Sequence, residues 1–166
     1  MDQTQLEQLM QKYAAEVAEA RRWLHRHPEL SWKEQETQKF ILEKLRAHGI
    51  ECEADPESTA VLGTIRGALP GKTVALRADI DALPVCEQSS SPYPSENPGV
   101  MHACGHDMHT AGLLGAAFLL QELRGSLHGC VRLIFQPAEE AGATRSGAQV
   151  LTARGVLEQL QVDAIF

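Results

Sequence analysis

The sequence predicts an α/β fold in which helices flank a sheet that is at least partly parallel. Segments with helical periodicity alternate with short apolar runs of the kind that form buried strands. Acidic residues directly follow two of these runs, and sites in α/β sheets lie beyond the carboxyl ends of strands. The chain has 166 residues, 43% of them hydrophobic, which is enough for one core. It contains no internal repeat and no interdomain linker.

Two helices are expected at the start of the chain. Apolar residues recur at helical spacing between Thr4 and His27, and Pro28 marks the end of this first helix. Ser31-Trp32-Lys33-Glu34 matches a capping box, with serine at the cap and glutamate three residues later. The second helix that this box would open ends at Gly49.

The middle of the chain changes to the pattern of strands. Residues 60–65 and 73–79 predict two strands, and Leu69-Pro70-Gly71 between them predicts a turn. The strand over 73–79 is expected to be buried and to deliver polar groups at its carboxyl end. Residues 86–99 are rich in Ser, Pro, Asn and Gly and predict a loop.

Helices and strands alternate again toward the end. The pattern predicts a helix over 110–124, a buried strand over 130–135, a weak helix over 147–160 and the beginning of a strand over 162–166. A domain usually tails off in polar residues, whereas this sequence ends in Ile165-Phe166. We therefore expect it to be the N-terminal part of a longer protein.

The charge and composition exclude some classes of partner. The net charge is −7 and there is no dense basic run, which argues against nucleic acid or an anionic membrane surface as partner. The polar start lacks the parts of a signal peptide, and the longest apolar runs are too short to span a bilayer, so we expect a cytoplasmic protein. The four cysteines are scattered, which argues against a disulfide framework and leaves open a metal or catalytic role for one of them.

Cys104 and His106 flank a single glycine. A thiolate and an imidazole at this spacing can reach one metal ion or a close pair of ions if the backbone turns tightly, which Gly105 permits. The alternative is that Cys104 is a small buried residue and His106 a helix cap. His102 and His109 crowd the same region without being assigned as ligands, and four other histidines are expected at surface or boundary positions: His25, His27, His48 and His128.

Two acidic pairs follow predicted strands. Glu139 and Glu140 are adjacent, so one carboxylate could bind a metal while the other acts as general base; the alternative is a solvated acidic pair on a loop. Asp79 and Asp81 alternate and should therefore point to one face. One of them could orient a histidine ligand, and the alternative is a pair of turn-capping aspartates.

Four motifs occur in order and closely resemble the N-acyl-amino-acid amidohydrolase family, which includes hippurate hydrolases and plant auxin-conjugate hydrolases. This family belongs to the aminoacylase- and carboxypeptidase-type dinuclear metallohydrolases. The motifs are Arg22-Trp23-Leu24-His25-Arg26-His27-Pro28-Glu29-Leu30, Arg77-Ala78-Asp79-Ile80-Asp81-Ala82-Leu83-Pro84, Met101-His102-Ala103-Cys104-Gly105-His106-Asp107 and Leu133-Ile134-Phe135-Gln136-Pro137-Ala138-Glu139-Glu140.

The resemblance implies a site and a reaction. Cys104, His106 and Glu140 would be metal ligands, Glu139 would be the general base, and Asp81 would orient a ligand. Two divalent ions (Zn, Mn, Co or Ni) would activate a water that hydrolyses the amide bond of a small N-acyl amino acid. In such proteins a histidine ligand, a lid or dimerisation domain and a last histidine follow downstream, and the full-length protein would be a homodimer.

The resemblance also sets the expected organisation. Residues 1–166 would form the N-terminal portion of a zinc-exopeptidase-like catalytic domain with three layers, and the lid would be absent from this sequence. One alternative is a catalytically inactive truncated product that lacks the downstream histidines. A weaker alternative is a hydrolase that uses Cys104 as nucleophile.

Overall fold

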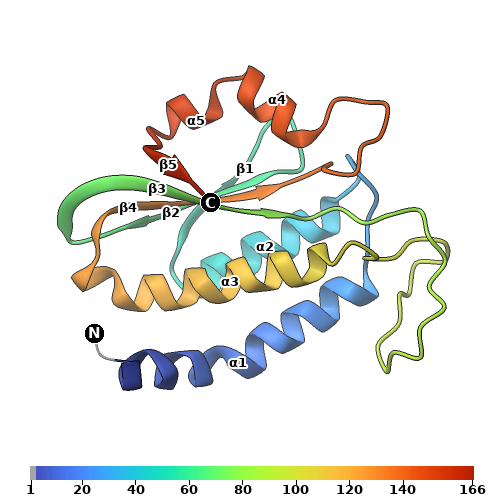
Figure 1. Cartoon of the computed structure of the whole chain (residues 1–166), viewed down its shortest axis with the longest axis horizontal. Coiled ribbons are helices and arrows are strands. Elements are labelled where there is room, and N and C mark those ends of the chain that lie inside the picture. The colour runs from blue at the N-terminus through green and yellow to red at the C-terminus, as the bar shows by residue number, and fades with distance from the viewer. Residues whose placement is uncertain (1–2) are drawn as a thin grey trace.

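A mixed five-stranded sheet separates two layers of helices in the computed structural model, which describes residues 3–166 (Figure 1). Three helices lie on one face: α1 (Gln3–Arg26), α2 (Gln35–Ala47) and α3 (His106–Leu123), followed by a short 3-10 turn, η1 (Arg124–Ser126). Two short helices lie on the other face: α4 (Gly147–Ala153) and α5 (Val156–Gln159). The predicted α/β class with flanking helices is confirmed.

The sheet combines antiparallel and parallel pairings. Its strands are β1 (Glu51–Ala54), β2 (Val61–Arg66), β3 (Leu69–Asp79), β4 (His128–Gln136) and β5 (Ala164–Ile165). They lie in the order β1-β2-β4-β3-β5; the first two pairings are antiparallel and the last two are parallel. Because β3 and β4 run in parallel with Asp79 opposite Gln136, their carboxyl ends meet at one edge of the sheet. The segments that follow both strands therefore leave from the same place.

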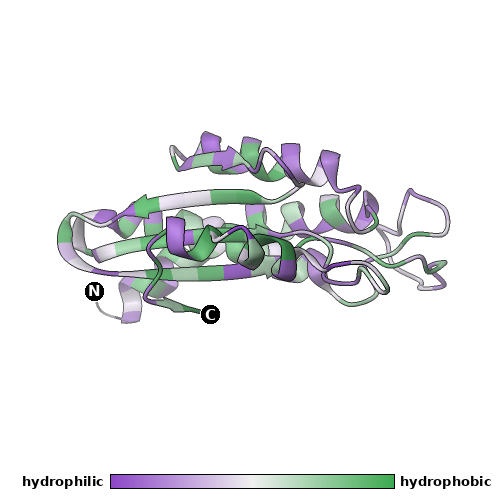
Figure 2. Cartoon of the chain, turned by 90° about the horizontal axis from the view of Figure 1, so that it is seen from above, coloured by the Kyte–Doolittle hydropathy of each residue, from purple (hydrophilic) through white to green (hydrophobic). Residues whose placement is uncertain are grey.

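Apolar residues fill the spaces between the three layers. The larger cluster lies between the sheet and helices α2 and α3, and the smaller one lies under α4 and α5. Figure 2 shows hydrophobic colour along the strands and more hydrophilic colour on the outer helices. Fully burying a side chain of the size of Leu or Phe contributes roughly 1.5–3 kcal/mol. The largest members of the first cluster are Phe118, Phe135, Ile41, Leu45, Ile65, Ile80, Leu114 and Leu133.

The capping box predicted for the second helix is wrong. Helix α2 begins at Gln35, and the side chain of its N-cap residue, Glu34, does not cap it; the Glu29 carboxylate instead accepts the N–H groups of Glu36 and Thr37. The Ser31 hydroxyl instead donates to Asp81 Oδ2 at 2.7 Å, and the Glu34 side chain is completely buried. Both residues therefore point into the protein, toward partners that a local pattern does not reveal.

Two boundaries also differ from the prediction. The expected turn at residues 69–71 is part of β3, because the chain reverses earlier, at Gly67 and Ala68. A side chain at Gly67 would meet the Leu127 carbonyl oxygen at 2.4 Å, so the reversal needs glycine there. The helix expected over 147–160 is broken into α4 and α5 by Gly155, whose φ is +68°.

The burial of the strands follows from their places in the sheet. Strand β1 is a short and largely exposed edge strand, and no apolar run in the sequence predicted it. Residues 73–79 of β3 are less buried than predicted, since only Ala75 and Ala78 are buried and β5 pairs with this strand only at Val74 and Ala75. The predicted loop over 86–99 contains no helix or strand. Among residues 3–166, no helix is long and apolar enough to cross a membrane.

Candidate metal centre

Three chain segments converge beyond the carboxyl ends of β3 and β4. Asp81 follows β3, Cys104 and His106 lie at the start of α3, and Glu140 follows β4. The potential ligand atoms of Cys104, His106 and Glu140 all lie within 4.8 Å of one another. The structure thus brings together the three residues that the sequence analysis selected as metal ligands.

A left-handed glycine lets Cys104 and His106 face the same point. Gly105 has a φ of +83°, a conformation that glycine adopts without steric penalty, and it is the N-cap of α3. Helix α3 consequently begins at His106, four residues before the predicted start. Cys104 is exposed, and His106 is a buried helical residue, which contradicts the alternative of a buried cysteine and a capping histidine.

Asp81 fixes the orientation and the protonation of the His106 ring. The Nδ1 atom of His106 lies 2.9 Å from the Asp81 carbonyl oxygen and 3.2 Å from Asp81 Oδ1. Because a carbonyl oxygen can only accept, Nδ1 carries the proton and donates it. The Nε2 lone pair is then free, and Nε2 lies 3.9 Å from Glu139 Oε2. A histidine held in this way by its other nitrogen is a common form of metal ligand.

Hydrogen bonds keep the buried Asp81 carboxylate ionised. Its residue is only 1% exposed. Burial by itself would raise the pKa of Asp81, but hydrogen bonds from His106, Ser31 and the Glu140 backbone outweigh it and leave the pKa below its usual value. In the same way, burial opposes the charged form of His106, yet its hydrogen bonds to Asp81 raise the pKa of that ring above the usual value.

Glu139 and Glu140 follow a turn with unusual backbone geometry. Ala138 is fully buried and has a φ of +52°, a rare conformation for a residue with a side chain. The Glu140 N–H donates to Asp81 Oδ2 at 2.9 Å. The Glu140 carboxylate faces Cys104 and raises the pKa of that thiol through a hydrogen bond, while the Glu139 side chain, 43% exposed, faces His106. The two neighbouring carboxylates therefore face different partners in the site, Glu140 facing Cys104 and Glu139 facing His106.

A second group of possible ligands overlaps with the first. Atoms of Asp79, His106 and His109 also lie within 4.8 Å of one another, so both aspartates of the alternating pair lie beside His106. However, Asp79 Oδ1 already accepts from Arg77 Nη2 at 2.6 Å and Gln136 Nε2 at 3.0 Å. Both groups need His106 Nε2, because Nδ1 is engaged by Asp81. The sulfur, nitrogen and oxygen set with Cys104 and Glu140 therefore fits a borderline divalent metal better.

Two buried histidines near this site were not assigned by sequence. His25, expected at a surface or boundary position, is buried, with Nδ1 at 2.9 Å from Asp107 and Nε2 at 3.3 Å from Glu87. His102 is 4% exposed, and neither ring nitrogen has a hydrogen-bond partner among residues 3–166. Burial lowers the pKa of His102 to about 4, so its ring is neutral at physiological pH. Proximity to Cys104 in the sequence was the only available signal for His102.

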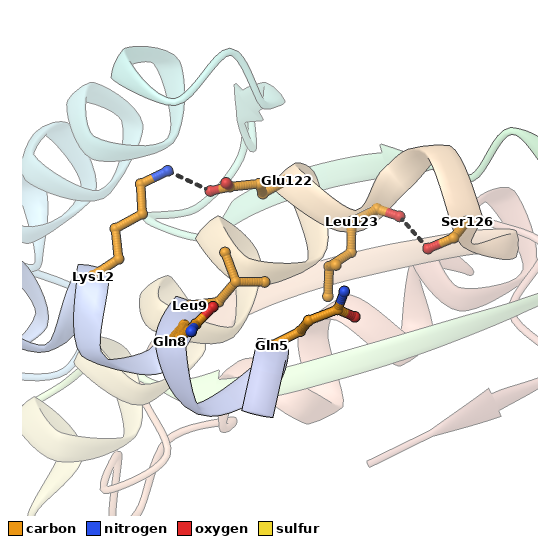
Figure 3. Close-up of a pocket in the computed structure, with 7 residues that line it drawn as sticks. All are labelled: Gln5, Gln8, Leu9, Lys12, Glu122, Leu123 and Ser126. Carbon is orange, nitrogen blue, oxygen red and sulfur yellow. Dashed lines mark hydrogen bonds and ion pairs between the residues drawn. The ribbon is translucent and has the colours of Figure 1, made fainter. Parts of the chain in front are cut away.

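One large groove lies far from these residues. It has a volume of about 570 Å³ and lies between the first turns of α1 and the end of α3, where Lys12 pairs with Glu122 at 2.7 Å (Figure 3). Helix α3 separates it from His106 by roughly 24 Å, at 1.5 Å per residue over sixteen residues. It contains no cluster of possible metal ligands and is separate from the candidate metal centre.

Comparison with known proteins identifies the class. Residues 75–166 match the model of peptidase family M20/M25/M40, so the chain belongs to this family. It is 52% identical over 145 residues to an N-acetyl-L-cysteine deacetylase of Bacillus subtilis, covering 87% of this chain and 33% of that protein. It is 41% identical over 162 residues to an N-acyl-L-amino acid amidohydrolase of Geobacillus stearothermophilus, covering 98% of this chain and 43% of that protein.

A solved structure supports the same relationship. A dinuclear metal-binding M20 peptidase from Bacillus subtilis superimposes with a TM-score of 0.85 at 47% identity, over 94% of this chain and 43% of that one. The expected family and fold are therefore confirmed. The chain spans less than half the length of the relatives described here.

Proposed function

We propose that this protein takes part in the metal-dependent hydrolysis of the amide bond of N-acyl amino acids. The observation that carries the proposal is the convergence of Cys104, His106 and Glu140 beside the Glu139 carboxylate, at the edge where β3 and β4 end. Relatives at 41–52% identity are named for the deacetylation or hydrolysis of N-acyl amino acids.

Cys104, His106 and Glu140 would hold the metal. We propose a pair of divalent ions, because the related Bacillus subtilis structure is a dinuclear metal-binding peptidase. Zn, Mn, Co and Ni all suit a set of thiolate, imidazole and carboxylate ligands. When bound, such ions supply an acidified water and polarise the carbonyl group of the amide.

Glu139 would act as the general base and Asp81 as the positioning residue. The partly exposed Glu139 carboxylate can take a proton from the attacking water and return it to the nitrogen of the leaving amine. The water oxygen joins the acyl carbon as the C–N bond breaks, and the products are a carboxylic acid and a free amino acid. Asp81 keeps the proton on His106 Nδ1 throughout, so that Nε2 remains available as a ligand.

The remaining expectations concern the whole protein. We propose that residues 1–166 correspond to the N-terminal portion of the catalytic domain, and that further histidine ligands and a lid or dimerisation domain come from additional sequence. A homodimer and a cytoplasmic location stay predictions. The relatives' named activities do not favour the inactive alternative. A Cys104 nucleophile is also disfavoured, because Glu140 raises the pKa of the thiol that would have to ionise.

The test combines metal removal with a substrate panel. The purified full-length protein is assayed on N-acetyl and N-benzoyl amino acids before and after a chelator, and then after addition of each of the four metals. We expect activity to vanish with the chelator and to return with metal. Activity that survives complete metal removal would contradict the proposal. If alkylation of Cys104 then abolished that remaining activity, a Cys104 nucleophile would be favoured.

A further inference from the structure

The side chains of Ser31 and Glu34 do not cap helix α2; Glu34 reaches the loop that carries Glu139 and Glu140 directly, and Ser31 reaches it through Asp81. We propose that they form a clamp that fixes the backbone of residues 138–140 and thereby sets the positions of the general base and of one metal ligand. The roles of Glu139 and Glu140 rest on the proposed function. The clamp itself is a set of contacts within this chain.

Glu34 holds the start of the loop. Its carboxylate is 0% exposed, Oε1 accepts the Ala138 N–H at 2.9 Å, and Oε2 accepts the Thr59 hydroxyl at 2.5 Å. Burial raises the pKa of Glu34 even though these bonds and the Trp32 N–H favour its charged form. A carboxylate is costly to bury, and one that is retained in the interior is expected to make specific bonds. Here those bonds lead to the residue directly before Glu139.

Ala138 needs such a restraint. Its positive φ of +52° is strained for a residue with a Cβ, and such a conformation persists only where the surroundings determine it. Glu34 binds its N–H, and its carbonyl oxygen accepts the Gly147 N–H at 3.1 Å. A side chain at Gly147 would lie 1.9 Å from the Pro137 carbonyl oxygen, so the loop packs closely on this side as well. Without Glu34, Ala138 would lose the partner of a buried N–H and would relax.

Ser31 holds the other side of Glu139 through Asp81. The Ser31 hydroxyl donates to Asp81 Oδ2 at 2.7 Å, and the same oxygen accepts the Glu140 N–H at 2.9 Å. Asp81 also orients His106. The residues before and after Glu139 are therefore each bound to a buried carboxylate, and both carboxylates depend on the segment between α1 and α2.

Small displacements of this loop have large chemical consequences. A general base acts only within hydrogen-bond reach of the proton that it takes. A misplacement of about 1 Å can lower a rate about 10²-fold, and the loss of a group that supports a metal ligand typically weakens metal binding about 10- to 100-fold. Loss of the clamp should therefore affect turnover and metal affinity together.

The experiment compares Glu34→Ala with Glu34→Gln in the full-length protein. Co²⁺ affinity is read from the thiolate-to-cobalt absorption of Cys104, and kcat and KM are measured at saturating Co²⁺ on an N-acetyl amino acid. We expect Glu34→Ala to weaken Co²⁺ binding about 10- to 100-fold and to lower kcat about 10²-fold with little change in KM. Glu34→Gln keeps an oxygen that can accept from Ala138 and should restore most of both quantities.

Two further variants separate the clamp from general stability. Thr37→Ala removes an equally buried side chain of α2 whose hydroxyl has no hydrogen-bond partner among residues 3–166, and it should leave Co²⁺ affinity and kcat unchanged. If Glu34→Ala does not fold, Ser31→Ala, at a half-buried position, should produce a smaller loss of the same kind. Wild-type Co²⁺ affinity and kcat in a folded Glu34→Ala, or in Ser31→Ala where Glu34→Ala does not fold, would overturn the clamp.

A last variant separates the clamp from the proposed function. If Glu139→Gln keeps wild-type turnover, the proposed function fails, and the Co²⁺ affinities alone still decide whether the clamp exists. If Glu139→Gln loses turnover while the folded clamp variants keep both wild-type values, the clamp fails and the proposed function stands.

Discussion

Replacing Asp81 by asparagine tests the arrangement at the centre of the site. Asp81 is 1% exposed; its Oδ2 accepts from Ser31 Oγ and the Glu140 N–H, and its Oδ1 lies 3.2 Å from His106 Nδ1 in an ion-pair contact. An asparagine of the same shape has one oxygen and one NH₂ group, so it can accept from only part of this set. If its oxygen serves Ser31 and Glu140, its N–H faces the Nδ1 proton of His106. Nδ1 keeps its hydrogen bond to the Asp81 carbonyl oxygen, but the new contact between two donors pushes the ring from its position and disturbs Nε2.

The expected loss can be estimated from the number of contacts broken. The ion-pair contact between His106 Nδ1 and Asp81 Oδ1 becomes a contact between two donors, and an interaction with a charged group contributes about 1.5–3 kcal/mol. Changing the group that orients a ligating histidine lowers metal affinity about 10- to 100-fold, which corresponds to about 1.4–2.8 kcal/mol. The two estimates agree, so Asp81→Asn should weaken Co²⁺ binding by this factor and lower kcat at limiting metal.

Asp79→Asn is the matched control, because Asp79 lies two residues away and belongs to the competing ligand group. Its carboxylate pairs with Arg77 and Gln136, so its replacement should change Co²⁺ affinity by less than about threefold. The assay is a titration with Co²⁺ in which the bound metal is measured by equilibrium dialysis, and the absorption of the cobalt thiolate reports whether Cys104 is a ligand. If Asp79→Asn abolished binding and Asp81→Asn did not, the metal would be bound by Asp79, His106 and His109, and our assignment would be refuted.

Three other changes should have measurable effects. Glu139→Gln should lower kcat about 10²- to 10⁴-fold while Co²⁺ binding persists, and wild-type turnover would exclude Glu139 as the base. Arg154 binds Asp55 through two hydrogen bonds of 2.7 Å; burial opposes the shift, but these bonds and one from Ser58 lower the pKa of Asp55. The contribution of the Asp55–Arg154 pair to the unfolding free energy is therefore complete above the unfolded-state pKa of about 3.9, and it is lost as the pH falls through the lower folded-state pKa of Asp55. The unfolding free energy of Asp55→Asn, measured with urea, should consequently depend less on pH below about 4 than that of the wild type. Gly155→Ala places a side chain at a φ of +68° and should lower the unfolding free energy by about 1 kcal/mol in the same urea assay. An unchanged unfolding free energy would show that the break between α4 and α5 tolerates a Cβ.

The main strands and the candidate ligands could be predicted because their signals are local. The strands over 73–79 and 130–135 are apolar runs, and the rule that sites lie beyond carboxyl strand ends placed Asp81 and Glu139 at the same edge. The glycine between Cys104 and His106 predicted a tight turn, and its φ of +83° is what such a turn requires. Strand β1 had no comparable signal, because an exposed edge strand with Glu51 and Glu53 carries no apolar run.

The misinterpreted capping box shows where local patterns fail. Serine and glutamate three residues apart fit a helix start, but the partners that Ser31 and Glu34 bind lie 50 and 104 residues away in the sequence. Only the fold brings Asp81 and Ala138 to them. The buried His25 was missed for the same reason, since its partners Glu87 and Asp107 come from distant segments.

The charges at the site explain why a cation is expected there. Among residues 3–166, no lysine or arginine forms an ion pair with Asp81, Glu139 or Glu140, whereas Asp79 pairs with Arg77. The basic group that pairs with Asp81 and Glu139 is His106, whose Nε2 turns a lone pair rather than a proton toward Glu139 when Nδ1 donates to Asp81. Carboxylates brought together without a positive partner repel one another, and a divalent ion bound by Cys104, His106 and Glu140 would remove that repulsion. The negative charge gathered at this edge of the sheet therefore favours metal binding independently of the resemblance to known enzymes.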